Sequence, residues 1–339
     1  MSINLVIISN EKFYIKENNF YCDNVAEKTL PDGLNKTFNI EVIARSTNLK
    51  RAHELTFKNV ILFKSLIFYL LEVAKKIREK NNKFLILSIS PYTFFATILF
   101  VFSGKKPFVY LRSDGYQEYK SIFGFYGPII YSFMFNIVSK IGSFISCREY
   151  ILKKNKGQVV LPSELTNNWI VNRKPVSLEK VKLLYVGRVK KEKGIFSLAE
   201  IVGDNNENVF LTIVGSTKKT INKINKKNII IHEIINNEKQ LIQLYDEHNI
   251  FVLPSYTEGY PMVVLESLAR LRPIIIFREI QHIIGNKKGI FIAERNKESF
   301  FKTITYIKNN YEIIQKEIKQ NQLPTKEMFL KKLENLISN

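Results

Sequence analysis

Short apolar runs alternate with longer segments of helical periodicity along the whole chain of 339 residues. In the first half, INLVIIS, NIEVIAR, FLILSIS and PFVYLRS have the character of buried strands, and NVILFKSLIFYLLEVAKKIREK is predicted to form one long helix. In the second half, KLLYVG, NVFLTIVG, NIIIHEI, NIFVLPS, RPIIIF and GIFIAE are strand-like, with a helix predicted after each of the first four and another from Lys297, after GIFIAE. This alternation indicates parallel strands joined by crossover helices, and therefore an α/β fold.

The periodicity lapses around NRKPVSLEK, residues 172–180, before the next strand-like run begins. We place a domain boundary there, with one domain over residues 1–173 and the other over residues 180–320. Each is long enough to bury its own core. We find no short internal repeat in the sequence, which argues against a solenoid.

One apolar segment, FLILSISPYTFFATILFVFSG, is nearly as long as a membrane span and covers residues 84–104. Ser90 is a suitable helix N-cap, Pro91 suits the first helical position, and Gly104 suits the position after a helix. The segment therefore predicts a buried strand followed by a core helix, with a transmembrane helix as the alternative.

A second apolar segment, YGPIIYSFMFNIVSKIGSF, has helical spacing and leaves two interpretations open. It forms either a core helix or an aromatic-rich surface helix that leans into a membrane interface, with Lys120 and Lys140 nearby. The apolar positions that recur are Ile129, Ile130, Phe133, Met134, Ile137 and Val138.

The composition is that of a protein folded throughout, with 45% hydrophobic and 24% charged residues. Two cysteines, Cys22 and Cys147, are too few for a disulfide framework, which favours a reducing cytoplasm. The N-terminal MSINLVIISNEK lacks the basic region and cleavage site of a signal peptide, so secretion is not expected.

The formal charge is +20, from 51 Lys and Arg against 31 Asp and Glu. Residues 1–180 contribute 26 − 14 = +12 and the remainder 25 − 17 = +8, so the excess belongs to neither half. Such a charge attracts polyanions, whether nucleic acid, an anionic bilayer or phosphorylated substrates. An AT-rich coding sequence is the alternative source, because Lys, Asn and Ile are all abundant.

The first candidate motif, YVGRVKKEKG, joins a predicted strand to a predicted helix. Gly187 allows a sharp turn and Gly194 begins the helix, so Arg188 and Lys193 can converge at the carboxyl edge of the sheet. Two cations there suit a diphosphate, although a solvated basic loop is the alternative. The motif is neither GxxxxGK[ST] nor GxGxxG, which argues against a P-loop ATPase and a dinucleotide dehydrogenase.

The second candidate motif is SYTEGYPMVVLESLA, which follows the strand-like IFVLP. We predict that Glu258 lies in a loop at the carboxyl edge, that Pro261 is the first helical residue, and that Glu266 lies in the second helical turn. Free amides around Gly259 would bind an anion. The alternative is a capping box between Ser255 and Glu258, which the late helix start disfavours.

Together, GRxxxxKG and EGxPxxxxE resemble the nucleotide-sugar half of retaining glycosyltransferases of the GT-B fold, family 4 or glycosyl transferases group 1. The resemblance covers the whole chain in element order and specific residues in the second half. It implies two Rossmann-like domains with parallel sheets that face a cleft, and a C-terminal helix, residues 324–339, that packs back on the first domain.

The family's roles can be carried onto matching positions. Arg188 and Lys193 would neutralise the donor diphosphate, so that no metal or other cofactor is needed. Glu258 would contact the hydroxyls of the transferred sugar, and Glu266 those of the ribose. Further donor contacts are implied for Gly187, Gly259, Tyr260, Pro261, Met262 and Val263, with His232 near the nucleobase. The sequence contains no Asp-x-Asp, and its four histidines lack a metal-ligand spacing.

In the first half, FVYLRSDGYQEY aligns with a segment where this family often carries a His-Asp pair. Asp114 is predicted to face the cleft as a catalytic group, and Arg112 and Ser113 to face the acceptor, unless the segment is only an Asp-Gly turn. The family's N-terminal Gly-Gly loop is replaced by ISNEKFYIKENNFY, and RPIIIFREIQHII departs from its Pro-Glu loop.

The resemblance implies a metal-independent hexosyltransferase that moves a sugar, with retention of configuration, from a nucleoside diphosphate to a glycan acceptor. With the basic charge, it suggests a lipid-linked acceptor in bacterial surface polysaccharide synthesis, such as capsule or lipopolysaccharide, and a cytoplasmic enzyme peripheral on the inner membrane face. A GT-B epimerase or phosphorylase and a nucleic-acid-binding protein are the rivals. The dispersed basic residues and the lack of a recognition motif argue against nucleic acid.

Overall fold

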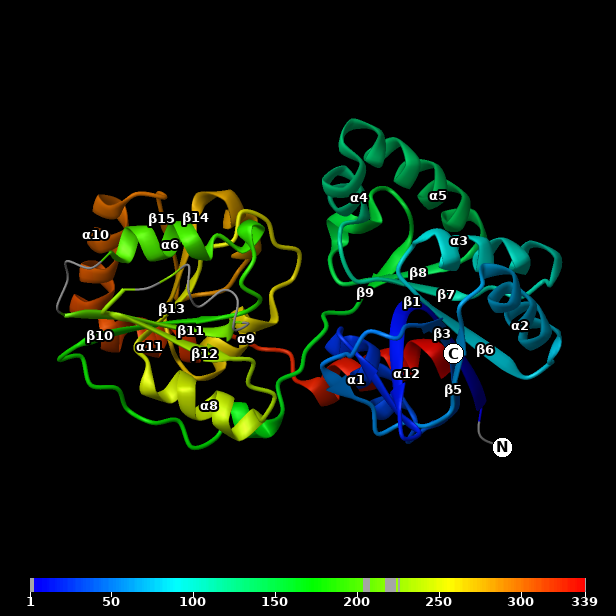
Figure 1. The fold of residues 1–339 in the computed structure, drawn as a ribbon, viewed down its shortest axis with the longest axis horizontal. Coiled ribbons are helices and arrows are strands. Elements are labelled where there is room, and N and C mark those ends of the chain that lie inside the picture. The colour runs from blue at the N-terminus through cyan, green and yellow to red at the C-terminus, as the bar shows by residue number, and fades with distance from the viewer. Residues whose placement is uncertain (1–2, 204–207, 217–223, 225, 339) are drawn as a thin grey trace. The chain divides into compact units, whose positions relative to one another are not determined.

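A computed structural model describes residues 3–203, 208–216, 224 and 226–338 of the chain. It divides into two compact units. The first unit comprises residues 1–162 and 326–339, and the second comprises residues 163–325, so the chain passes twice between them. Figure 1 shows the elements of each unit, and both have the mixed α/β composition that the sequence predicts.

The first unit is built on a mostly parallel sheet. Its parallel strands lie in the order β5-β3-β1-β6-β7-β8-β9, and β2 and β4 add an antiparallel extension beside β1. The strands are β1 (Ile3–Lys16), β2 (Asn19–Cys22), β3 (Phe38–Ser46), β4 (His53–Glu54), β5 (Val60–Phe63), β6 (Asn82–Leu87), β7 (Phe108–Leu111), β8 (Ser143–Ser146) and β9 (Gly157–Val159). The order reverses between β1 and β6, as in a Rossmann fold.

Helices cover both faces of this sheet, as Figure 1 shows. One apolar core includes Tyr69, Phe94 and Phe135, and the other includes Leu30 and Phe329. The helices are α1 (Val25–Leu34), α2 (Leu66–Arg78), α3 (Pro91–Ile98), α4 (Gly115–Phe123), α5 (Gly127–Ile141) and α12 (Lys326–Ser338), with single 3₁₀ turns η1 (Leu99–Phe102), η2 (Gly124–Tyr126) and η3 (Glu149–Leu152). The C-terminal α12 thus packs in the first unit, far along the chain from α1 beside it.

The predicted long helix over NVILFKSLIFYLLEVAKKIREK is wrong in its first part. Val60–Phe63 forms β5, which pairs in parallel with β3, and α2 begins only at Leu66. The run VILF is rich in branched apolar residues that favour strands, and the Ser65 side chain caps α2 by accepting from the Ile67 amide.

The segment over residues 84–104 is a strand and a helix, as predicted. β6 is buried between β1 and β7, and α3 begins at Pro91 with a capping box between Ser90 and Thr93. Residues Phe94 and Ala96 of α3 are buried. The transmembrane alternative for this segment is therefore not adopted.

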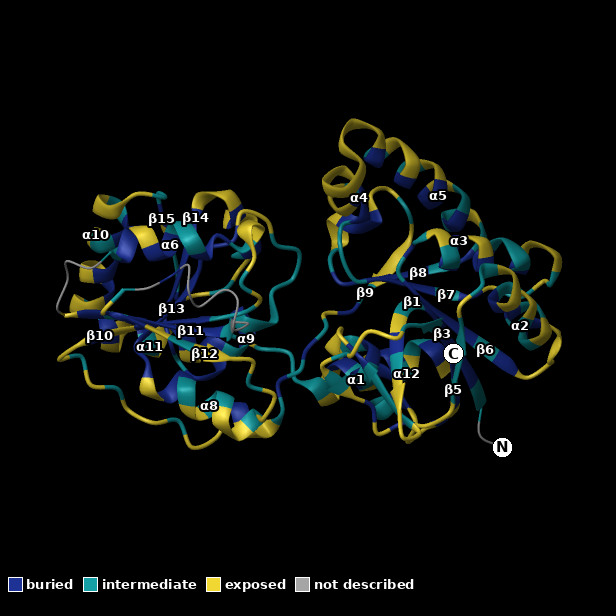
Figure 2. Ribbon diagram, in the orientation of Figure 1, coloured by how far each residue is buried: buried dark blue, intermediate teal, exposed yellow. Residues whose placement is uncertain are grey.

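The second apolar segment is neither wholly buried nor wholly exposed. Met134 and Val138 of α5 are buried in the core of the first unit, whereas Ile129, Ile130 and Phe133 lie exposed. The core-helix interpretation therefore holds for one face of α5 only, and contact of the other face with a membrane stays a prediction. Figure 2 shows this mixture of buried and exposed positions along α4 and α5.

The second unit is a fully parallel sheet with strand order β12-β11-β10-β13-β14-β15. Numbered from the unit's own first strand, this is the Rossmann order 3-2-1-4-5-6. Its strands are β10 (Val181–Val186), β11 (Val209–Ser216), β12 (Ile229–Glu233), β13 (Ile250–Leu253), β14 (Ile274–Phe277) and β15 (Ile290–Ala293). All six strand-like runs of the second half are therefore strands.

Helices enclose this sheet, and one apolar core fills the space between. They are α6 (Ile195–Val202), α8 (Glu238–Glu247), α9 (Met262–Ala269), α10 (Lys297–Asn309) and α11 (Tyr311–Lys319), with 3₁₀ turns η4 (Asn167–Trp169), η5 (Lys191–Lys193) and η6 (Arg278–Ile283). The helix predicted between β11 and β12 falls largely outside the described residues.

The boundary between the units lies earlier than the sequence indicates. Residues 163–173, which we assigned to the first domain, belong to the second unit. Trp169 is buried there and its ring lies 5.4 Å from that of Tyr245 in an edge-on contact. The segment around Trp169 is irregular and has no apolar periodicity, so the sequence did not show that it belongs to the second unit. The lapse in periodicity at residues 172–180 marks the end of this segment and not the domain boundary.

Candidate functional site

The two motifs of the second half lie at the point where the strand order of the sheet reverses. Gly187 follows β10, and the stretch from Pro254 to Pro261 follows β13. These two strands are neighbours in the sheet. The chain continues from β10 to β11 on one side of the pair and from β13 to β14 on the other. In open α/β sheets, ligands bind at the carboxyl ends of the strands at this switch point.

Arg188 provides an exposed positive charge at this edge. Its backbone carbonyl accepts a hydrogen bond of 2.9 Å from the buried Tyr185 hydroxyl, which holds the turn. Within the described part of the chain, its guanidinium forms no hydrogen bond or ion pair. Arg188 is therefore available to bind an anion.

Lys193 and Glu258 bring the two motifs together in an ion pair. The Lys193 Nζ donates to Glu258 Oε1 at 2.7 Å, and the same oxygen accepts from the Ser255 hydroxyl at 2.6 Å. Both charged side chains are largely shielded, with 20% and 10% of their surface exposed. A charge-assisted hydrogen bond in such surroundings is strong and fixes both side chains.

Gly194 makes this approach possible. It adopts a left-handed conformation with φ of 67°, and a Cβ atom added to it would lie 1.9 Å from the Pro254 carbonyl oxygen. No other residue fits between the two loops, because the space that a side chain needs is filled by backbone. The close approach of the two motifs therefore requires a glycine at position 194.

The helix that follows Glu258 begins one residue later than predicted. Pro261 is the N-cap and Met262 the first residue of α9. Glu266 consequently lies in the second turn, as predicted. The capping box between Ser255 and Glu258 is not formed, because the helix starts beyond both residues.

Glu266 is held by a tyrosine that the sequence did not single out. The hydroxyl of Tyr245, at the end of α8, donates to Glu266 Oε2 at 2.9 Å. The Tyr245 ring is fully buried and stacks on Phe251 at 5.6 Å between centroids. Burial raises the pKa of the Glu266 carboxyl to about 7, although the hydrogen bond from Tyr245 lowers it.

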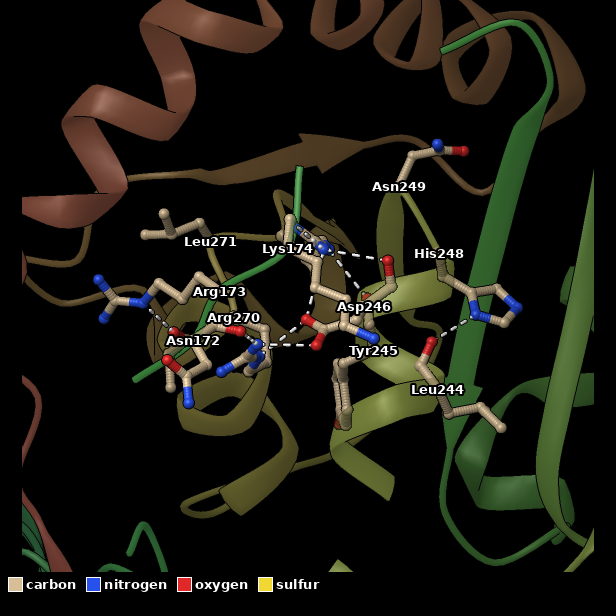
Figure 3. A network of polar contacts seen from close by, with 12 residues as sticks. Asn172, Arg173, Lys174, Leu244, Tyr245, Asp246, His248, Asn249, Arg270 and Leu271 are labelled. Carbon is tan, nitrogen blue, oxygen red and sulfur yellow. Dashed lines mark hydrogen bonds and ion pairs between the residues drawn. The ribbon is translucent and has the colours of Figure 1, made fainter. Parts of the chain in front are cut away.

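A buried network anchors α8 and the start of the second unit, as Figure 3 shows. Arg270 donates from Nε and Nη2 to the two carboxylate oxygens of Asp246, at 2.9 and 2.7 Å. Its Nη1 donates to the carbonyls of Trp169 and Val171. One arginine therefore ties α9, α8 and the preceding segment together.

Arg272 completes this network next to Tyr245. Its Nε donates to the Tyr245 carbonyl at 2.9 Å, and its Nη2 donates to the Lys174 carbonyl at 3.1 Å. Both Arg270 and Arg272 are 1% exposed. Because these arginines hold the backbone around Tyr245, the direction of its hydroxyl toward Glu266 is set by buried contacts.

The other predicted donor residues of the second unit lie at the same edge. Gly259, Tyr260, Pro261, Met262 and Val263 are partly buried and run from the Glu258 loop into the first turn of α9.

Two histidines differ in how they relate to this pair of motifs. His232 lies in β12 rather than after it, is exposed, and is two strands away from β10. His282, in η6, contacts the backbone carbonyl of Glu258 through Nε2 at 2.9 Å. It adds a contact to the Glu258 loop that the sequence did not indicate.

A hollow of about 510 Å³ lies beside the first motif and is distinct from this site. It shares Gly194 with the site, but neither Lys193 nor Glu258 lines it. Its lining residues are Lys191, Glu192, Gly194, Phe196, Ser197, Glu200 and Tyr256.

The candidate residues of the first unit have structural partners. Arg112 donates from Nη2 to the buried Glu27 at 2.7 Å, so its charge is largely balanced within the unit. Asp114 is the N-cap of α4, and its Oδ1 accepts from the Tyr116 and Gln117 amides. Asp114 thus caps a helix rather than closing an isolated Asp-Gly turn, its catalytic role stays a prediction, and Ser113 is partly exposed beside it. The acceptor role of these residues stays a prediction.

Among the residues that the structure describes, no group of three or more His, Cys, Asp or Glu side chains is arranged to hold a metal ion.

The sequence analysis did not identify Tyr245, Arg270 and Arg272, which hold Glu266 and the backbone around it in place. None of them lies in either motif, and each acts through a contact with a residue distant in the chain. The one available signal was the unusual pair of arginines directly after the second motif, where the helix turns back into a buried strand.

Residues 169–323 match the family model described as glycosyl transferases group 1. The Bacillus subtilis (strain 168) glycosyltransferase TuaC, named for teichuronic acid biosynthesis, is 29% identical over 145 residues, which are 42% of this chain and 37% of that protein. The capsular polysaccharide biosynthesis glycosyltransferase CapM of Staphylococcus aureus is 30% identical over 123 residues, 33% of this chain and 32% of that protein. The chain thus aligns with half or less of the length of these curated relatives.

Solved structures extend the likeness to both units. HepE of Anabaena, solved in complex with UDP, has a TM-score of 0.70 at 9% identity and covers 99% of this chain and 100% of that chain. WaaG, a glycosyltransferase involved in lipopolysaccharide biosynthesis, has a TM-score of 0.67 at 13% identity over 98% and 100%. At such identities the likeness shows the GT-B fold alone. The chain has this fold, and its resemblance to glycosyl transferases group 1, carried by residues 169–323, is confirmed.

Proposed function

We propose that the protein transfers a glycosyl group from a nucleoside-diphosphate sugar to a glycan acceptor. The observation that carries this proposal is the pairing of Lys193 with Glu258 across two motifs, at the switch point of a Rossmann sheet that matches glycosyl transferases group 1. Glu266, eight residues after Glu258, adds a second carboxylate from α9.

Each group in this site has a part in holding the donor. Arg188 and Lys193 bind the diphosphate, together with the amides at the start of α9. Glu258 accepts hydrogen bonds from hydroxyls of the transferred sugar, and Glu266 accepts them from the ribose. Because Lys193 is paired with Glu258 before the donor binds, the diphosphate competes for Lys193 and leaves Glu258 free to turn to the sugar.

The reaction proceeds with retention of configuration, by attack on the face from which the phosphate departs, and without a covalent enzyme intermediate. The charge that develops on the departing diphosphate is stabilised by Arg188, Lys193 and the helix N-terminus, so that no metal ion is required. Lys193 is already held at this edge of the sheet by its ion pair, so it needs only to exchange Glu258 for the diphosphate.

The acceptor we propose is a lipid-linked glycan of a bacterial surface polysaccharide, bound at the inner face of the cytoplasmic membrane. Support for the pathway comes from TuaC and CapM, whose names refer to teichuronic acid and capsular polysaccharide. Support for the location comes from the net charge of +20, which favours an anionic bilayer. The proposed function of the whole protein rests on the names of these relatives and on the net charge together.

A donor screen with matched variants tests this proposal. Hydrolysis and thermal stabilisation are measured with UDP-, GDP- and ADP-sugars, for the wild type and for Lys193→Ala, Glu266→Ala and Glu258→Ala. The first two variants should bind the donor about tenfold or more weakly, since each loses a charge-assisted hydrogen bond, while Glu258→Ala mainly slows transfer. Lys190→Ala in the same loop is the control, because Lys190 is half exposed and pairs weakly at 3.9 Å.

The outcomes separate the rival functions. Normal turnover by all three variants would remove the assignment. Conversion of the nucleotide sugar to an isomer without any acceptor would make the protein an epimerase. Binding to oligonucleotides at physiological salt, without any effect of nucleotide sugars, would instead indicate a nucleic-acid-binding protein.

A further inference from the structure

The helices α4 and α5 form a hairpin whose outer turns carry large apolar side chains in solvent. Figure 2 shows exposed positions over the turn that joins the two helices. Phe125 is 80% exposed and Tyr126 is 69% exposed. We define the hairpin patch as Ile122, Phe123, Phe125, Tyr126, Ile129 and Phe133, all of them more than half exposed. Single exposed apolar residues are ordinary, but a contiguous set of six within twelve residues marks an interaction surface.

The hairpin is a rigid part of the first unit. Its inner face buries Tyr119, Tyr131 and Phe135 in the core of the unit. At the turn, a Cβ added to Gly127 would lie 2.0 Å from the Tyr119 carbonyl oxygen, so the two helices are in close contact there. The patch is therefore held outward by packing beneath it and cannot be buried by folding the hairpin back.

Length excludes a membrane-spanning role for this segment. Residues 115–141 are apolar enough to cross a membrane by composition, with only 28% of the most apolar window buried. However, the segment is broken at Gly124, and α5 has 15 residues, or about 22 Å, against a hydrocarbon core of about 30 Å. The apolar turn can enter one side of a bilayer only.

Exposed lysines lie on the hairpin and beside its base. Lys120 is exposed on α4 itself. Lys153, which follows η3, has its Nζ 4.8 Å from the ring of Tyr116 in the first turn of α4, and Lys154 and Lys156 follow it, both exposed. The acidic groups in these two segments are Asp114, Glu118 and Glu149, and Asp114 is occupied in capping α4. The first unit as a whole carries 26 basic against 14 acidic residues, or +12.

We propose that the hairpin patch inserts into the interface of an anionic lipid bilayer, while the lysines beside it bind the headgroups. Apolar and aromatic side chains at the tip, with lysines behind them, are the arrangement by which peripheral proteins bind such interfaces. Lysines are depleted at protein–protein interfaces, which makes a protein partner the less suitable occupant. This inference rests on the proposed function, which places the acceptor at a membrane. It adds the surface of the protein that contacts that membrane.

Sedimentation of the full chain with vesicles tests the inference. The vesicles are phosphatidylcholine alone or mixed with phosphatidylglycerol. Phe125→Ser/Tyr126→Ser should lower partitioning to the mixed vesicles by about tenfold or more, because two large apolar side chains no longer insert. The matched control is Tyr306→Ser/Ile313→Ser, which alters two residues of the second unit that are 55% and 60% exposed. Lys154→Glu/Lys156→Glu should reduce the preference for phosphatidylglycerol and its sensitivity to salt.

A fluorescence measurement distinguishes insertion from adsorption. The single native tryptophan, Trp169, is 3% exposed in the second unit and provides a constant background. In Phe125→Trp, emission should shift to the blue with mixed vesicles and be quenched by brominated lipid, whereas the wild type shows neither change. Loss of partitioning with unchanged turnover of a soluble donor and acceptor pair leaves the proposed function intact.

Three results would overturn the inference. These are equal partitioning of the tip variant and the wild type, a Phe125→Trp signal that brominated lipid leaves unquenched, and a wild type that self-associates in solution without binding vesicles. Conversely, vesicle binding that depends on the patch in a protein without transferase activity would reject the proposed function and leave the inference standing.

Discussion

Glu266 is a carboxyl group in partly buried surroundings, and its ionisation should control the affinity for the donor. Its pKa of about 7 means that the ionised form, which accepts hydrogen bonds from ribose hydroxyls, predominates only above neutrality. We predict that the KM for the donor rises as the pH is lowered from 8 to 6, measured as a pH profile of initial rates. Since the pKa is raised on folding from its ordinary 4.5, the free energy of unfolding should also fall as the pH rises from about 4.5 to 7.

Two variants assign this pH dependence to Glu266. Glu266→Gln should flatten the profile, at a weaker affinity throughout. Tyr245→Phe should move it to higher pH, because the lost hydrogen bond had lowered the pKa. Tyr311→Phe, which removes a buried hydroxyl bonded to the Asn249 carbonyl at 2.7 Å, is the control and should leave the profile in place. A profile that Glu266→Gln does not change would assign the titration to another group.

At the level of the elements, the approach of the η5 turn to the loop after β13 depends on Gly194. We predict that Gly194→Ala destabilises the second unit and weakens donor binding about tenfold or more, because the added methyl group meets the Pro254 carbonyl and displaces Lys193. Denaturation and donor titration measure the two effects.

Gly203→Ala is the matched control for this prediction. Gly203 has a similar φ of 60°, but its nearest neighbour to an added Cβ is the Glu200 carbonyl oxygen at 3.6 Å. The variant should therefore lose about 1–3 kcal/mol to backbone strain, because its ψ of −175° is one that essentially only glycine adopts, and it should bind the donor normally. Equal effects of the two variants on donor binding would show that the close approach is unimportant for the site.

Among the elements, the strands of the second unit were predicted well, whereas β2, β4, β5, β8 and β9 of the first unit were not identified as strands. All six strands of the second unit were read from apolar runs, since a strand buried on both faces is apolar throughout. β5 was read as the start of α2, because a short apolar run beside a helix has no distinguishing period. The sequence also left open whether α5 is a core helix or a surface helix, since periodicity locates an apolar face without saying what covers it.

For the molecule as a whole, the Arg270–Asp246 pair holds the start of the second unit to its sheet. We predict that Arg270→Ala lowers the free energy of unfolding by about 3–5 kcal/mol, because it leaves the Asp246 carboxylate buried without its main partner. Urea denaturation followed by Trp169 fluorescence reports this directly, as that ring packs on Tyr245. Arg278→Ala, which removes an exposed ion pair with Glu294, should change little, and a similar loss in both would contradict the buried role.

The local pattern of residues was enough to indicate the α/β class, the two units, both motifs and the loop positions of Arg188 and Glu258. Strand and helix periods, glycine turns and proline starts are short-range properties that the chain carries residue by residue. Tertiary contacts alone decided the pairing of Lys193 with Glu258, the support of Glu266 by Tyr245, and the pairing of Arg112 with Glu27. These partners are 65, 21 and 85 residues apart, and no local pattern records which distant side chain a buried charge will meet.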